Sequence, residues 1–90
     1  MAATPKVMIK TTAGDGAQEA VAGPLPLPRA QGLAESMAAA DGWYAGGWVW
    51  DSLTPGLWRL LGHKTLTGGN GRERPAQLLQ ATGYILTEAG

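Results

Sequence analysis

Three of the chain's four tryptophans and one of its two tyrosines lie within eight residues, between Trp43 and Trp50. The chain has 90 residues and no phenylalanine, so these rings are the largest apolar side chains that it can bury. Side chains in an extended strand alternate between two faces. As a strand, the segment would place Tyr44, Trp48 and Trp50 on one face, and Trp43 with Val49 on the other.

This alternation means that a single thin sheet, well covered on one face only, does not bury all of these rings. Either they form the core of a small domain, or one set remains as an aromatic patch of the kind that anchors protein interfaces. Tryptophan, tyrosine and arginine dominate the binding energy of such interfaces. We therefore predict a partner-binding surface, with the core alternative left open. Its predicted residues are Tyr44, Trp48, Trp50, Trp58 and Arg59.

Local patterns in the first half predict a strand, an edge segment and a helix. β-branched residues alternate over Lys6–Thr12, which is typical of a strand. Residues 18–28 include three alternating prolines, which lack an amide donor and favour the edge of a sheet. Apolar residues at positions i, i+3, i+4 and i+7 predict an amphipathic helix over residues 28–40.

The second half predicts two shorter helices. Thr54 followed by Pro55 resembles a helix N-cap, which predicts a helix over residues 55–61. Pro75 begins a second predicted helix, which Gly83 ends. Short strands are expected at residues 63–67 and 84–87, and a loop is expected at residues 68–74. Residues 1–90 should thus form one small α+β domain, a mostly antiparallel sheet with one amphipathic helix and two shorter helices packed on it.

Charge composition weighs against a general nucleic-acid binder, because seven basic and seven acidic residues cancel. A local basic segment nevertheless follows the tryptophans, from Arg59 to Arg74. Aromatic rings beside cations can stack bases and neutralise phosphates. A small nucleic-acid-binding protein that uses stacked tryptophans with Lys64, Arg72 and Arg74 is therefore the second hypothesis. A structural subunit that self-associates through a sheet edge or the aromatic face is the third.

The sequence lacks the residues that several kinds of catalytic and metal site require. The absence of cysteine excludes disulfides, thiolate metal sites and cysteine nucleophiles, and it fits a reducing compartment. His63 is the only histidine, and neither serine lies in a nucleophile-elbow pattern. We therefore expect no catalytic residue, no metal and no cofactor.

No apolar run reaches the length of a signal peptide or a membrane span, so we expect a cytoplasmic protein without membrane contact. The leading hypothesis is a non-enzymatic protein–protein interaction module. The small size and the many glycines and alanines suggest an inhibitor or accessory protein of phage or mobile-element type. The sequence does not identify its partner.

Overall fold

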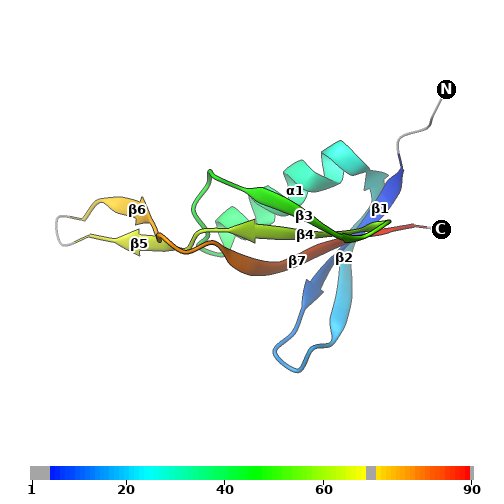
Figure 1. Cartoon of the computed structure of the whole chain (residues 1–90), viewed down its shortest axis with the longest axis horizontal. Helices are drawn as coiled ribbons and strands as arrows, with labels where there is room; N and C mark the ends of the chain where they lie inside the picture. Colours follow the sequence, from blue (N-terminus) through cyan, green and yellow to red (C-terminus); the bar gives the residue numbers. More distant parts are fainter. Residues whose placement is uncertain (1–4, 69–70, 90) are drawn as a thin grey trace.

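The chain folds into a five-stranded antiparallel sheet with a helix across one of its faces (Figure 1). The computed structural model describes residues 5–68 and 71–89. The strand order is β2-β1-β7-β4-β3, and a separate two-stranded hairpin, β5–β6, extends from the end of the body. The elements are β1 (Lys6–Thr12), β2 (Gln18–Pro26), α1 (Leu27–Ala40), β3 (Val49–Thr54), β4 (Leu57–Gly62), β5 (Thr65–Thr67), β6 (Glu73–Pro75) and β7 (Gln80–Glu88).

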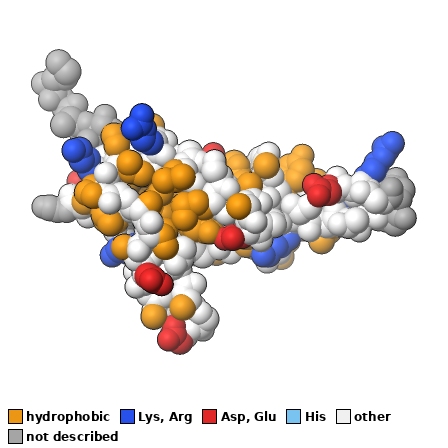
Figure 2. All heavy atoms as spheres, turned by 180° about the vertical axis from the view of Figure 1, so that it is seen from behind, with side chains coloured by type: hydrophobic (Ala, Val, Ile, Leu, Met, Phe, Trp, Pro, Cys, Tyr) orange, Lys and Arg blue, Asp and Glu red, His pale blue; other side chains and the backbone are white. Residues whose placement is uncertain are grey.

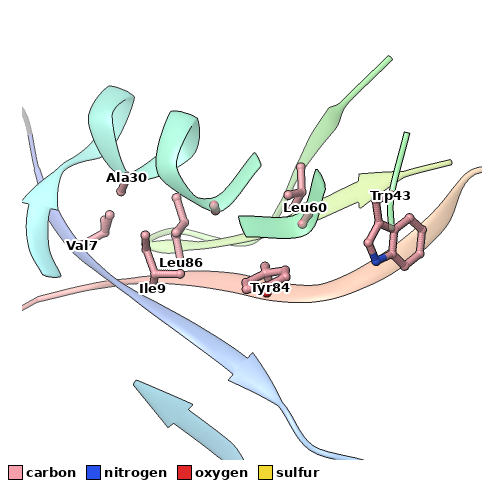
Figure 3. Packing of buried hydrophobic residues seen from close by; sticks show 9 residues of the cluster. Val7, Ile9, Ala30, Trp43, Leu60, Tyr84 and Leu86 are labelled. Carbon is pink, nitrogen blue, oxygen red and sulfur yellow. The ribbon is translucent and has the colours of Figure 1, made fainter. Parts of the chain in front are cut away.

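A line of alanines on α1 forms the helix side of the core. Ala30, Ala34 and Ala38 recur every fourth residue, so they share one face of the helix, and none of them is exposed. Beneath them lie large side chains of the sheet, among them Ile9 of β1 and Leu86 of β7 (Figure 3). Because alanine is small, the helix can lie close to the strands, and a short chain can bury a continuous core.

The first half of the chain confirms its predicted elements. The strand Lys6–Thr12 has the expected bounds, and the helix begins one residue before the predicted range, at Leu27. β2 pairs with β1 alone and therefore is an edge strand, as its prolines predict. Gly23 has a φ of +105°, and a methyl group there would lie 2.7 Å from the Val7 carbonyl oxygen. Only glycine fits this close approach between β2 and β1.

The predicted helix over residues 55–61 is wrong, because Leu57–Gly62 form strand β4. Pro55 and Gly56 instead make the turn of the β3–β4 hairpin, and Gly56 has the positive φ, +81°, that a type II turn requires at its third position. β4 lies between β7 and β3, and both of its faces are at least half-buried. A short apolar run of this kind does not show by periodicity whether it is a strand or a helix.

The predicted helix from Pro75 to Gly83 is also wrong. Residues 76–79 are irregular, and β7 already begins at Gln80. β7 lies in the centre of the sheet and pairs with both β1 and β4. Hydrogen bonding on both sides outweighs the modest helix propensity of this segment.

The aromatic segment is a strand only at its end. β3 starts at Val49, and residues 43–48 form a loop with a single bridge between Trp43 and Lys64. Gly42 and Gly47 both have positive φ angles, which bend the chain where a strand was predicted. The short strand expected at residues 63–67 is confirmed as β5. The loop expected at residues 68–74 includes the start of β6, and its residues 69–70 lie outside the described part of the chain.

The close contact under α1 yields a stability prediction. Ala34→Leu should lower the free energy of unfolding by about 1–3 kcal/mol, because a buried position without exposed surface has no room for three more carbons. Gly32→Ala is the matched control on the exposed side of the same helix, where an added methyl group meets no atom within 4 Å. It should raise the free energy of unfolding by up to about 1 kcal/mol. Urea unfolding followed by circular dichroism measures both changes, and a neutral Ala34→Leu would contradict this packing.

Candidate partner-binding site

The two faces of the sheet differ in what covers them. Side chains of β4 alternate, so that Trp58 and Leu60 point toward α1 while Arg59 points away from it. Cross-strand partners share a face. Trp50, the partner of Leu60, therefore lies on the helix side, and Asp51, the partner of Arg59, lies on the uncovered face.

Three of the predicted contact residues, Trp48, Trp50 and Trp58, are half-buried on the helix side, where they pack against the core cluster. The Trp50 indole Nε1 donates a 2.8 Å hydrogen bond to the carboxylate of Glu35, which ties β3 to the helix. Trp43 is buried within the core, with 7% of its surface exposed. The tryptophans thus contribute to the core and also border the edge of the sheet.

The other two predicted contact residues, Tyr44 and Arg59, are not among the side chains that pack against the core cluster. Tyr44 is exposed in the loop before β3, where its backbone N–H donates to the His63 carbonyl oxygen. Arg59 lies on the uncovered face and forms a 2.8 Å ion pair with Asp51. Its Nε is buried and has no hydrogen-bond partner among the described residues. The five predicted residues therefore do not form one continuous patch, and their binding role stays a prediction.

Strand β3 carries Trp50 and also Asp51, the ion-pair partner of Arg59. It pairs with β4 on one side, and within the described part of the chain no strand pairs with its other side. We call this unpaired side of Val49–Thr54 the β3 edge. Val49 and Leu53 on this strand are 42% and 45% exposed, while Trp50 borders the same edge on the helix side. The β3 edge thus presents apolar side chains beside unpaired backbone groups.

The basic residues of the nucleic-acid hypothesis lie on and beside the β5–β6 hairpin. The Lys64 ammonium lies 4.0 Å from the centre of the Trp43 ring, in a cation–π contact. Arg74 pairs across the hairpin with Leu66, and Arg72 also makes an interaction of its own. The Lys64 contact brings one of these cations onto a tryptophan ring, and the nucleic-acid role of Lys64, Arg72 and Arg74 stays a prediction.

A buried tyrosine beside a carboxylate is the most perturbed titratable group. The Tyr84 hydroxyl donates a short hydrogen bond to Asp41, at the end of α1. Burial first, and then this hydrogen bond and the negative charge of Asp41, raise the pKa of Tyr84 to about 12. This contact joins the central strand β7 to the end of the helix. Among the described residues, no hydrogen bond links the Tyr84 hydroxyl to a histidine, lysine or serine side chain.

Residues 5–68 and 71–89 contain neither a metal-binding cluster nor a membrane-spanning helix. No group of three histidine, aspartate or glutamate side chains there could hold a metal ion. Within the same ranges, no helix has the length and hydropathy to span a bilayer. His63, the only histidine, lies with its Nδ1 2.8 Å from the Ala76 carbonyl oxygen, which fits a hydrogen bond that fixes the segment before β7.

Sequence reasoning missed three polar contacts, which join Asp51 to Arg59, Trp50 to Glu35 and Tyr84 to Asp41. The first of them had only part of a signal in the sequence. A two-residue turn at Pro55-Gly56 predicts the β3–β4 hairpin but would pair Asp51 with Leu60, and the register shift between Ser52 and Thr54 is what brings Asp51 opposite Arg59. The other two contacts depend on where the helix crosses the sheet, and local spacing carries no signal for that.

The packing of Trp48 on β4 yields a second prediction. A methyl group at Gly62 would lie 2.7 Å from the Trp48 ring, so Gly62→Ala must displace that ring. We expect a loss of about 1–3 kcal/mol in the free energy of unfolding and a shift in tryptophan fluorescence. Gly14→Ala, in a turn with no atom within 4 Å of the added carbon, should change neither quantity. An unchanged emission spectrum in Gly62→Ala would show that Trp48 does not lie over β4.

The Tyr84 contact predicts a pH dependence. A pKa raised from 10 to about 12 means that the folded state holds the phenol proton more tightly than the unfolded chain does. The resulting stabilisation is complete below pH 10 and is lost as the pH rises through 12. Chemical unfolding between pH 9 and 12 should show this decline, on the order of 2 kcal/mol, and Tyr84→Phe should flatten it. Equal slopes for both proteins would contradict the Tyr84 contact.

Comparison with known proteins adds no family to this geometry. No protein-family model, no curated protein and no solved structure matches the chain. The functional argument therefore depends on the placement of the residues, above all on the β3 edge and the side chains that border it.

Proposed function

We propose that this protein is a non-catalytic protein-binding module that holds an extended segment of its partner against the β3 edge. The observation that carries the proposal is the unpaired outer side of β3, which ends the sheet with exposed Val49 and Leu53. Unpaired N–H and C=O groups of an edge strand are a template for another strand. In strand addition, main-chain hydrogen bonds supply affinity and alternating side chains supply specificity.

The two edges of the sheet are not equivalent, and the difference favours β3. The β2 edge contains Pro24 and Pro26, and its register with β1 shifts twice. Prolines and bulges are the usual means by which a sheet edge is protected from further pairing. Strand β3 has no proline and only one register shift, near its end at Thr54. A partner strand therefore finds one protected edge and one open edge.

Side chains on both faces of the β3 edge define what the partner should present. On the helix side, an added strand would lie beside Trp50, which is held in place by its bond to Glu35. On the uncovered face it would lie beside Val49 and the Asp51–Arg59 pair. A partner segment with apolar residues at alternate positions on both faces matches this arrangement.

The distribution of charge favours protein over nucleic acid. On the face that Figure 2 shows, apolar side chains gather on the wide end of the molecule, and lysine and arginine side chains lie scattered at the margins of the view. Nucleic-acid binding relies on gathered cations that neutralise phosphates. The nucleic-acid hypothesis and the inhibitor or accessory role stay predictions. Self-association through the same edge would produce a defined dimer in sedimentation velocity, whereas the proposal expects a monomer.

A matched pair of variants tests the proposal. Peptides are selected against the protein from a display library of extended sequences, and their affinity is measured by fluorescence anisotropy. Val49→Lys should weaken binding about tenfold, because a charge on the open edge strand opposes the pairing of a further strand. Val21→Lys is the control, since Val21 is 44% exposed on the protected β2 edge and Val49 is 42% exposed.

The control should retain the affinity of the parent protein. Two results would contradict the proposal, namely equal weakening by both variants and a selection that yields no extended peptide. Far-ultraviolet circular dichroism of both variants shows that the exposed substitutions leave the fold intact.

A further inference from the structure

A cavity of about 310 Å³ lies where the C-terminal end of α1 meets the following loop and the β5–β6 hairpin. It is separate from the β3 edge and plays no part in the proposed function. Its lining includes Ala39, Gly42, Trp43, Tyr44, Thr65 and Glu73.

Negatively charged groups line and border this cavity. Glu73 is the charged residue of the lining, and it forms no ion pair with another described residue. The C-terminal end of a helix carries partial negative charge, and the last turn of α1 contains no basic residue that would offset it. Asp41 adds a carboxylate at the same helix terminus. These groups favour a cation over an anion, and the Lys64 ammonium over the Trp43 ring is a cation already at the border of the cavity.

The aromatic part of the lining favours an organic cation over a metal ion. The protein already places an organic cation on one of these rings, because the Lys64 ammonium lies 4.0 Å from the centre of the Trp43 ring. Tyr44 supplies a second ring beside it, with 36% of its surface exposed. Aromatic rings attract ammonium groups through their negative faces, and a nearby carboxylate adds to this attraction.

We propose that this cavity binds an alkylammonium group. The carboxylate of Glu73 and the end of α1 attract its charge, while Trp43 and Tyr44 contact its alkyl part. The Lys64 ammonium already contacts the Trp43 ring. A ligand ammonium must therefore compete with Lys64 for this ring. A lysine side chain of a partner and a free alkylamine share this head group.

Titration with n-butylammonium, followed by NMR signals of the Trp43 indole and the Gly42 amide, tests the site. Binding should be saturable, and n-butanol, which has the same alkyl chain without the charge, should bind at least tenfold more weakly. Glu73→Gln should weaken n-butylammonium binding about threefold, the size expected for an exposed charge pair. Glu19→Gln, at an exposed position on β2, is the matched control and should not change the affinity. Lys64→Met should strengthen binding, because it removes the competing ammonium.

Equal binding of n-butanol, or an unchanged affinity in Glu73→Gln, would overturn the proposal. Nα-acetyl-lysine N-methylamide separates the two sources of the head group. Tighter binding of this derivative assigns the cavity to a protein side chain, tighter binding of n-butylammonium assigns it to a free amine, and either result supports the cation site. Val49→Lys should leave n-butylammonium binding unchanged, so this test and the test of the β3 edge can fail independently.

Discussion

The contact between the alanine line of α1 and the strands beneath it determines most of this architecture. Ala30, Ala34 and Ala38 bring the helix close enough to bury Ile9 and Leu86 under it. One helix of 14 residues covers one face of a five-stranded sheet and leaves the other face without a helical layer. The hydrogen bonds from Trp50 to Glu35 and from Tyr84 to Asp41 then fix the helix at one edge and at its C-terminal end.

The candidate binding surfaces follow from this limited cover. β2 and β3 both end the sheet, but prolines protect β2 only. β3 instead carries exposed apolar side chains and an indole that is held by the helix. The cavity lies at the C-terminal end of α1, between the loop that follows the helix and the β5–β6 hairpin. Both candidate sites thus lie at places where the single helix ends its cover of the sheet.

The sequence predicted the elements whose patterns are local. Alternation over Lys6–Thr12 and the i, i+3, i+4, i+7 spacing of apolar residues in the helix predicted the right elements, and the prolines of β2 marked a true edge. Prediction failed at β4, which is at least half-buried on both faces, because its apolar run does not alternate. The strand predicted at residues 84–87 is confirmed as part of β7, but β7 begins at Gln80, within the range predicted as a helix. The same failure affected the candidate site. Arg59 was predicted to lie on the same short helix as Trp58, whereas in strand β4 it points to the face opposite Trp58.

Hydrogen exchange of the β3 amides, measured by NMR with and without a selected peptide, tests the central claim most directly. The account predicts that amides on the unpaired side of Val49–Thr54 exchange rapidly in the free protein and at least tenfold more slowly in the complex. Amides of the β2 edge should exchange at the same rate in both states. Protection that appears elsewhere while the β3 amides remain unchanged would contradict strand addition at this edge.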